Sequence, residues 1–227
     1  FGVYSASELA AGHVKVVLGG DGGDEMFAGY DRYLGNYLVD IYCALPGLVR
    51  SRVIEPLIDR LPDSYRYNNR VQKLRWLPAM SRSSGGRRYA ESACFLRFNH
   101  ERKQSLYTDA CWRDLRNNDS ADHLLQFFEA ENASNVIDRM LYTDVKTRLA
   151  EHLLMVGDRM TMAHGIEARS PLVDRYLAEF VATLPSRMKI RGRSLKYILR
   201  QVGRVDNPSR NPIILVEFGE IGTSGRL

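Results

Sequence analysis

The chain has 227 residues, of which 44% are hydrophobic and 26% are charged, and its formal net charge is +5. This length and balance are typical of one or one and a half globular domains, and no apolar run is long enough to span a bilayer. Because the N-terminal stretch FGVYSASELAAGHVK lacks the basic start and apolar middle of a signal peptide, we expect a cytoplasmic protein. The three cysteines, Cys43, Cys94 and Cys111, form no CxxC pair, which argues against a disulfide framework and a structural zinc site.

The first predicted elements are a strand and a glycine-rich turn. Val14, Val16, Val17 and Leu18 form a short apolar run, which is typical of a strand covered on both faces. The run ends at a turn that combines four glycines with three carboxylates: Gly19, Gly20, Asp21, Gly22, Gly23, Asp24 and Glu25. A long helix is predicted to follow, with a buried stripe formed by Phe27, Tyr30, Leu34, Tyr37, Leu38, Ile41 and Leu45.

This turn combines two properties that suit a ligand site. Its glycines allow positive φ angles and a close approach to the backbone, and its carboxylates place negative charge in the same few residues. The carboxyl end of a parallel strand is also where open α/β sheets bind ligands. Since an acidic loop cannot hold a phosphate unaided, its natural partner is Mg²⁺, held by a carboxylate and shared with nucleotide phosphates. The alternative is a structural connection in which Asp24 caps the helix.

The middle of the chain is predicted to be helical. From Pro46 to about Ser120 the pattern indicates short helices, with breaks at Pro62 and Pro78. Between Arg50 and Lys103 there are 13 Lys and Arg against 5 Asp and Glu. Because no nucleic-acid motif accompanies this charge, we interpret it as a charged helical surface and expect no nucleic-acid partner. Residues 121–155 indicate two more helices with these core residues: Leu124, Leu125, Phe127, Phe128, Met140, Leu141, Val145, Leu149 and Leu153.

The last part of the chain carries a polar stretch and two helices. In Val156 to Asp174, structural roles are favoured for His164, Arg169 and Asp174, the latter two in ion pairs. Asp174 is predicted to start a helix that ends at Pro185 and buries Leu177, Phe180, Val181 and Leu184. A second helix is predicted to begin at the N-cap Ser194, to end at Gly203, and to bury Leu195, Ile198, Leu199 and Val202. Lys196 then lies in its first turn, where a cation opposes the helix dipole, so it is either a solvated or a functional lysine.

Three stretches resemble the synthetase domain of glutamine-dependent asparagine synthetases. The run GGDGGDEMFAGYDRY resembles that family's SGDGGDELFGGY signature. The stretch from Val156 to Pro185 is similar to VDRxSMAxxxExRxPFLDxxLxEFAxxLP, and RGRSLKYILRQV resembles the GxxKYxLRxA helix. The resemblance covers about residues 1 to 202. It implies an α/β fold, a fragment of an adenine-nucleotide alpha-hydrolase-like (Rossmann-like) synthetase domain that is predominantly helical here, with one strand and most of the sheet absent.

The resemblance also implies an activity, which is ATP-dependent amide-bond formation by a carbon-nitrogen ligase of asparagine biosynthesis. Aspartate would be converted to asparagine through a β-aspartyl-AMP intermediate, with ammonia from glutamine, ATP and Mg²⁺, in a full-length protein expected to be a homodimer. Asp24 is expected to hold Mg²⁺, and the nucleotide is expected to lie against Gly19, Gly20, Gly22 and Gly23. The expected catalytic residues are Asp21, where the intermediate forms, and Lys196, which faces the phosphates. Asp158 and Arg159 are expected to frame the site.

The chain departs from the family pattern in ways that limit this interpretation. Gly19 replaces the serine of the signature and so lacks its hydroxyl, and neither an SGGxDSS nucleotide loop nor an N-terminal glutaminase cysteine is found. We therefore expect a partial domain over residues 1–202 that is inactive alone, and a divergent, poorly ordered tail over residues 203–227. Two alternatives stay open: an adenylating amidotransferase or lactam- or peptide-cyclising synthetase that acts on another carboxylate, and a non-catalytic remnant.

Overall fold

The computed structural model describes residues 1–62, 70–93, 100–131, 133 and 135–206. In these residues the chain is mostly helical and has one two-stranded sheet. It forms two compact units, one with Phe1–Tyr30 and the chain from Leu141 onward, and one with Asp31–Met140. No helix among the described residues is long and apolar enough to cross a membrane. Cys43 and Cys111 are free thiols, and Cys94 lies outside the described residues.

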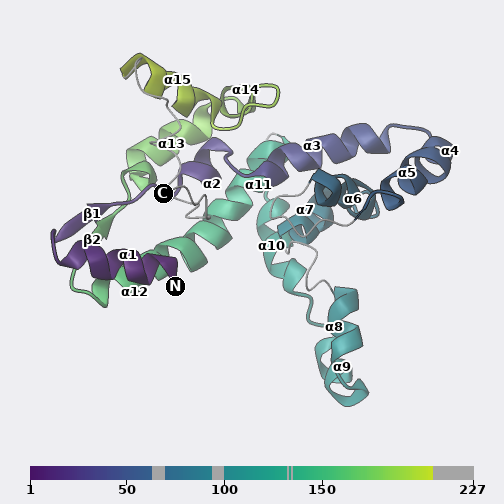
Figure 1. The fold of residues 1–227 in the computed structure, drawn as a ribbon, viewed down its shortest axis with the longest axis horizontal. Helices are drawn as coiled ribbons and strands as arrows, with labels where there is room; N and C mark the ends of the chain where they lie inside the picture. The colour runs from purple at the N-terminus through teal and green to yellow at the C-terminus, as the bar shows by residue number, and fades with distance from the viewer. Residues whose placement is uncertain (63–69, 94–99, 132, 134, 207–227) are drawn as a thin grey trace. The chain divides into compact units, whose positions relative to one another are not determined.

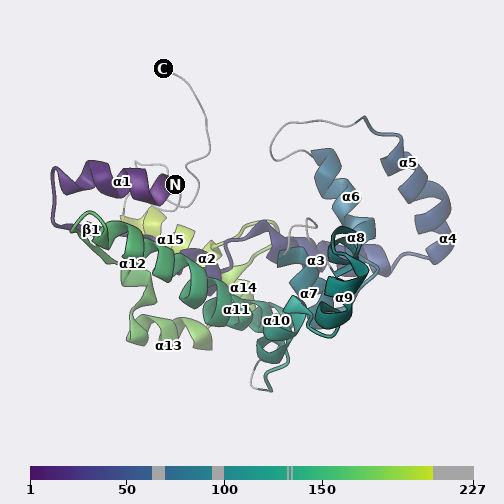
Figure 2. The same ribbon diagram turned by 90° about the horizontal axis from the view of Figure 1, so that it is seen from below.

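The first unit contains the sheet, the glycine-rich turn that follows β1, and the helices around them. Its elements are α1 (Gly2–Ala11), β1 (Val16–Leu18), α2 (Gly23–Phe27), the end of α11 (Val136–Asp144), the π-helix η2 (Val145–Leu154), α12 (Met155–Met162), β2 (Glu167–Arg169), the 3-10 helix η3 (Pro171–Val173), α13 (Arg175–Thr183), α14 (Ser186–Lys189) and α15 (Tyr197–Asp206). Figure 1 shows β1 beside β2 and α1 beside α12. The end of α11, η2 and α12 follow one another as consecutive helical segments of this unit (Figure 2).

The predicted strand is confirmed at Val16–Leu18, and it pairs in parallel with β2, which was not predicted. Val17 faces Ala168 in the register. The prediction that β1 is covered on both faces is wrong for the described residues, since Val16 is 41% and Leu18 74% exposed. β2 has only three residues with charged ends, so its sequence shows no apolar run that would indicate a strand.

The single long helix predicted after the turn is divided into two. α2 ends at Phe27, and Ala28 adopts a left-handed conformation with φ of 59°. The amide of Gly29 then donates to the carbonyl of Asp24 at 2.9 Å, which closes the helix end. Helical spacing of apolar residues continues across this break, so the pattern alone cannot reveal it. Within the first unit, Met26 and Phe27 form a buried core with Val181, against which these residues pack: Val145, Leu172, Leu177, Ala178, Leu184, Ile198 and Leu199.

The second unit is helical throughout its described residues. Its elements are α3 (Asp31–Cys43), α4 (Gly47–Val49), the π-helix η1 (Arg50–Ile54), α5 (Glu55–Asp59), α6 (Arg70–Met80), α7 (Gly85–Ala93), α8 (His100–Leu106), α9 (Asp109–Leu115), α10 (Ser120–Phe128) and most of α11. The helices predicted around Leu124 and Met140 are confirmed. The predicted break at Pro62 agrees with the end of α5, whereas Pro78 lies inside α6, two residues before its end.

The buried face of α3 is not the predicted one. Tyr37 and Ile41 of the predicted stripe are 59% and 50% exposed, whereas Tyr33 and Val39 are fully buried. Polar residues share this buried face because they find partners there, which a hydrophobic pattern does not show. The Arg32 guanidinium donates to the Tyr89 hydroxyl at 3.3 Å, and the rings of Tyr33 and Tyr89 stack at 6.5 Å.

Candidate functional site

The glycine-rich turn begins where β1 ends, at the carboxyl edge of the sheet. The Gly19 amide donates to the Arg169 carbonyl at 2.8 Å, which extends the ladder by one bond. Gly22 has φ of 86°, and a Cβ atom there would lie 2.7 Å from Val173 Cγ2. This position therefore requires glycine for its backbone and for its packing.

The four glycines expected to face a nucleotide differ in accessibility. Gly22 and Gly23 are buried, and a Cβ on Gly23 would approach Leu172 of η3 to 3.1 Å. Gly20 is exposed, with nothing within 4 Å of the place where its Cβ would lie. The first half of the turn is thus open to an approaching molecule, whereas the second half packs against η3.

Asp24 and Lys196 form an ion pair in the first unit. Lys196 Nζ lies 2.8 Å from Asp24 Oδ1, and the exposed fractions of the two side chains are 8% and 30%. The ammonium also lies 3.8 Å from the position of a Cβ on Gly23. Asp24 was expected to hold the metal and Lys196 to face the phosphates, and the two side chains contact each other directly.

Lys196 is not in the first turn of a helix, and it is not a solvated lysine. α15 begins at Tyr197, and Lys196 precedes it with a left-handed φ of 51°. The carbonyl of Lys196 accepts from the Arg200 amide at 2.9 Å, so Lys196 takes the place expected of Ser194 at the helix start. The predicted end at Gly203 is also wrong, since α15 continues to Asp206. The rest of the expected tail, residues 207–227, lies outside the described residues.

The left-handed conformation at Lys196 is a local cost. A non-glycine residue with positive φ is disfavoured by about 1 kcal/mol or more, and such strain persists only where surrounding contacts hold it. The contacts here are the ion pair with Asp24 and the packing of Ile198 and Leu199 against the Met26 and Phe27 core.

Glu25, the third carboxylate of the turn, faces the protein interior. It is 1% exposed and accepts a short hydrogen bond from the Tyr30 hydroxyl, which in turn accepts from Arg148 Nε at 3.0 Å. Burial raises the pKa of the Glu25 carboxyl above its ordinary value of 4.5, and the Tyr30 bond offsets part of that rise. Burial and the Glu25 carboxylate likewise raise the pKa of Tyr30. Glu25 therefore anchors α2 and does not face a ligand.

Asp21 accepts a hydrogen bond from Ser170, the residue that follows the second strand. Ser170 Oγ donates to Asp21 Oδ2 at 3.2 Å, although the two residues are 149 positions apart in sequence. A Cβ on Gly19 would lie 2.8 Å from the same carboxylate oxygen, so the absence of a side chain at Gly19 makes room for this orientation of Asp21. Ser170 and Arg148 were missed by sequence reasoning, because neither belongs to a recognisable local pattern.

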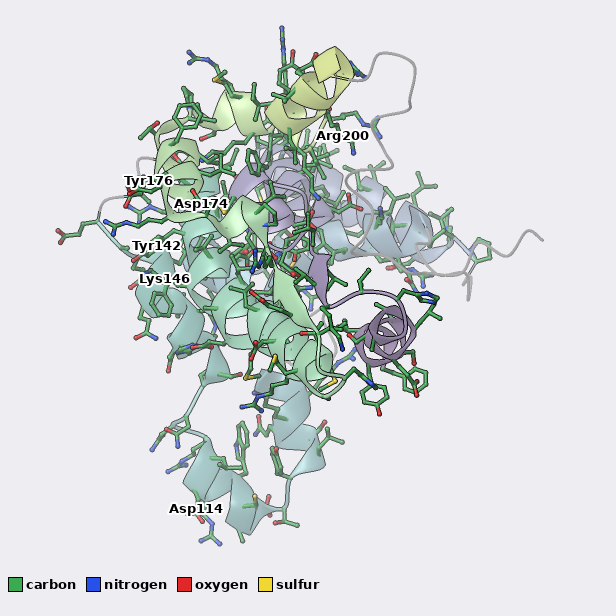
Figure 3. All side chains as sticks on the ribbon, turned by 90° about the vertical axis from the view of Figure 1, so that its left-hand side faces the viewer. Asp114, Tyr142, Lys146, Asp174, Tyr176 and Arg200 are labelled. Atoms are coloured by element: carbon green, nitrogen blue, oxygen red, sulfur yellow. The ribbon has the colours of Figure 1, made fainter. Side chains whose placement is uncertain are left out.

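The remaining sequence candidates serve structural roles or face solvent. Asp158 and Arg159 are exposed on α12. Arg169 pairs with Glu167 at 2.9 Å, as predicted. Asp174 instead caps α13 by accepting from the amides of Tyr176 and Leu177, at the helix start that Figure 3 shows. His164 packs edge-on against Tyr4 with ring centroids 4.4 Å apart.

The other predicted stripes are partly confirmed. Val181 of α13 is buried, and Leu177 and Leu184 pack against the core, but Phe180 is 60% exposed. Ile198 and Leu199 of α15 pack as predicted, whereas Val202 is 51% exposed.

The turn can offer a cation few ligands of its own. No group of three or more His, Cys, Asp or Glu that could hold a metal ion is found among the described residues. Asp24 is partly exposed, and one of its carboxylate oxygens is paired with Lys196. Glu25 is buried and hydrogen-bonded to Tyr30. Mg²⁺ commonly takes one or two carboxylates and completes its shell with water and substrate phosphates. The residues therefore fit a cation that is shared with phosphates, and they do not fit an all-protein metal site.

These features define a class of protein. A parallel strand pair whose carboxyl edge carries an open glycine turn, a partly exposed aspartate and a buried lysine is typical of the ligand-binding edge of an α/β protein. The chain belongs to the asparagine synthase family, whose family model matches residues 1–209.

Individual relatives agree with this assignment. The chain is 24% identical over 202 residues to asparagine synthetase [glutamine-hydrolyzing] 1 of Bacillus subtilis, covering 88% of this chain and 29% of the relative. It is 28% identical over 200 residues to a putative asparagine synthetase [glutamine-hydrolyzing] of Mycobacterium tuberculosis, covering 88% of this chain and 28% of the relative. It is also 26% identical over 220 residues to the amidase chyE of Penicillium rubens, covering 86% of this chain and 30% of the relative. The chain thus spans less than a third of the length of these relatives, and no solved structure matches it significantly.

Proposed function

We propose that this chain is part of a synthetase that forms amide bonds at the expense of ATP. The reaction has two steps: a substrate carboxylate attacks the α-phosphorus of ATP, which releases pyrophosphate and forms an acyl-adenylate, and ammonia then displaces AMP. For the substrates we propose aspartate and ammonia from glutamine, with asparagine as product, in a homodimer with a Rossmann-like synthetase domain. Family membership over residues 1–209 supports this proposal.

The observation that carries the proposal is the pairing of Asp24 with Lys196 at the carboxyl edge of β1. It places one negative and one positive group within 2.8 Å of each other, next to a turn whose first half is open. A polyphosphate with a divalent cation needs this combination, because the cation requires a carboxylate and the phosphate oxygens require a positive charge.

Each residue has a stated role in this proposal. Asp24 would hold Mg²⁺, which when bound neutralises charge on the phosphates. Lys196 would donate to phosphate oxygens as charge develops on them, in a largely water-excluded place where such a contact is worth more than in water. Gly19 and Gly20 would let the nucleotide approach the backbone. Gly22 and Gly23 would allow the second half of the turn to pack against η3. Asp21, oriented by Ser170, would face the carbon where the adenylate forms.

A second substrate class is supported by one specific observation. The similarity to an amidase of Penicillium rubens means that the family resemblance extends to proteins that are not named asparagine synthetases. Adenylation of a different carboxylate, followed by attack of another amine, would use the same residues. A non-catalytic remnant is the third possibility, and it predicts no adenylation at all.

The test measures pyrophosphate release in the longest gene product that contains this sequence. Aspartate and a panel of other carboxylates are compared, and we expect aspartate to give the highest rate. Lys196→Ala should slow adenylation by roughly tenfold to a thousandfold, as expected for one lost transition-state charge contact. Asp24→Asn should impair its Mg²⁺ dependence, and Phe1–Leu227 alone should be inactive.

The matched control is Lys15→Ala, since Lys15 is exposed on the same unit. Equal rates for the parent, Lys196→Ala and Lys15→Ala would remove Lys196 from the active site. Absence of pyrophosphate release with every carboxylate would support the remnant.

A further inference from the structure

Two cations compete for the Asp24 carboxylate. One is the Mg²⁺ of the proposed function, and the other is the Lys196 ammonium that pairs with it in the structure. Lys196 Nζ is within hydrogen-bond distance of Asp24 Oδ1, and the lysine side chain is only 8% exposed. A divalent cation that binds this oxygen must first displace the ammonium.

Gly29 makes the close pairing possible. A Cβ atom on Gly29 would lie 1.7 Å from Asp24 Oδ1 and 2.2 Å from Lys196 Cε, so any side chain there would overlap both partners. The Gly29 amide also donates to the Asp24 carbonyl, so the backbone of this glycine is tied to Asp24. The backbone at Gly29 therefore bounds the pair on one side.

Displacement by a cation alone is unfavourable. Removing one partner from a buried ion pair leaves the other charge uncompensated, which costs far more than the pair contributes. A bare cation would leave the Lys196 ammonium without its counter-ion. A cation that arrives with a polyphosphate supplies a new anionic partner for the ammonium at the same time.

We propose that Lys196 guards Asp24, so that the site binds a divalent cation together with an anionic polyphosphate and resists the cation alone. This inference deepens the proposed function and rests on its assignment of Asp24 to the cation. It means that the resting site is closed by the lysine that later contacts the phosphates. Cation and phosphate binding are then linked by one exchange of partners at Lys196.

The test titrates the 227-residue chain with Mn²⁺ alone and follows free Mn²⁺ by electron paramagnetic resonance. Lys196→Gln should bind Mn²⁺ about tenfold more tightly than the parent, because the carboxylate is released and no ammonium is left without a partner. Lys196→Arg should bind as weakly as the parent, since it keeps the charge. Lys15→Gln is the matched control, because it makes the same change in net charge at an exposed lysine. Asp24→Asn in the Lys196→Gln background should abolish the gain.

Two results would overturn the inference in different ways. If Lys196→Gln binds no more tightly than Lys15→Gln while Asp24→Asn still weakens binding, the guard is wrong and the proposed role of Asp24 stands. If Asp24→Asn changes Mn²⁺ binding in neither background, the guard and the assignment of Asp24 both fail.

A second measurement needs no variant and is independent of how well Lys196→Gln folds. Acetic anhydride labels free amines, and mass spectrometry reports the rate at each lysine. In the parent chain, saturating Mg²⁺ should raise the labelling rate of Lys196 several-fold relative to Lys15, because the displaced ammonium becomes accessible. An unchanged ratio of the two rates, at divalent cation concentrations where the titration shows the parent chain to be occupied, would contradict the guard.

Discussion

The Arg148 guanidinium lies over the ring of Tyr30, 4.7 Å from its centroid, and donates to the hydroxyl of the same residue. The two residues are 118 positions apart in sequence, and the contact joins η2 to the segment between α2 and α3. Tyr30 passes this support on to Glu25 by donating its own hydroxyl. The short helix α2, which carries Asp24, is thus anchored by a hydrogen-bond network that runs from the Arg148 guanidinium through the Tyr30 hydroxyl to the buried Glu25 carboxyl.

Removal of the Tyr30 hydroxyl should destabilise this unit. Tyr30→Phe keeps the ring under Arg148 but leaves the buried Glu25 carboxyl without its donor, which should cost about 1–3 kcal/mol of unfolding free energy. Urea unfolding followed by circular dichroism measures the change. Tyr176→Phe serves as control, since Tyr176 is 80% exposed on α13 (Figure 3). Equal stability of the two variants would mean that the network contributes nothing.

The pH dependence of stability should identify the state of Glu25. Its folded pKa is raised, so the unfolded chain loses this proton at a lower pH than the folded chain. The contribution of Glu25 to stability is therefore fully present below its unfolded pKa, near 4.5, and is lost as pH rises through the higher folded value. Glu25→Gln has no proton to lose at this position. The difference in unfolding free energy between Glu25→Gln and the parent should shift in favour of Glu25→Gln as pH rises above about 4.5 toward neutrality, and a difference that stays constant would contradict the raised pKa.

Gly29 should tolerate no side chain. Gly29→Ala places a methyl group on Asp24 and Lys196 and should separate them, with an expected loss of about 3 kcal/mol or more of unfolding free energy. The matched control is Gly157→Ala in α12, where nothing lies within 4 Å of the added Cβ. That change should stabilise the chain by roughly 0.5–1 kcal/mol, because alanine is the better helix former. Thermal unfolding of the two variants shows whether their shifts have opposite signs, as this geometry requires.

Ser170 should matter through Asp21 alone. In the longest gene product that contains this sequence, Ser170→Ala removes the donor to the Asp21 carboxylate and should slow adenylation about three- to tenfold, while Ser170→Thr, which keeps the hydroxyl, should retain most of the rate. The unfolding midpoint of each variant is measured beside its rate. A Ser170→Ala variant with the rate of the parent would show that this hydroxyl does not position Asp21.

Local features of the chain were predictable from the sequence because they depend on neighbours along it. The strand at Val16–Leu18, the glycine turn after it and the start of α13 at Asp174 follow from apolar runs, turn residues and a capping side chain. The candidate residues Asp21, Asp24 and Lys196 came from motif resemblance, which reports residue types and order without reporting contacts.

Tertiary structure decided what each of these side chains faces. The Asp24 to Lys196 pair, the Ser170 to Asp21 bond and the Arg148 to Tyr30 bond beside the buried Glu25 all join residues to partners that packing alone brings within reach. The buried face of α3 depends in the same way on Arg32 meeting Tyr89. A polar group can be buried wherever a distant partner satisfies it, so neither hydrophobic spacing nor charge density along the chain can tell such a group from a solvated one.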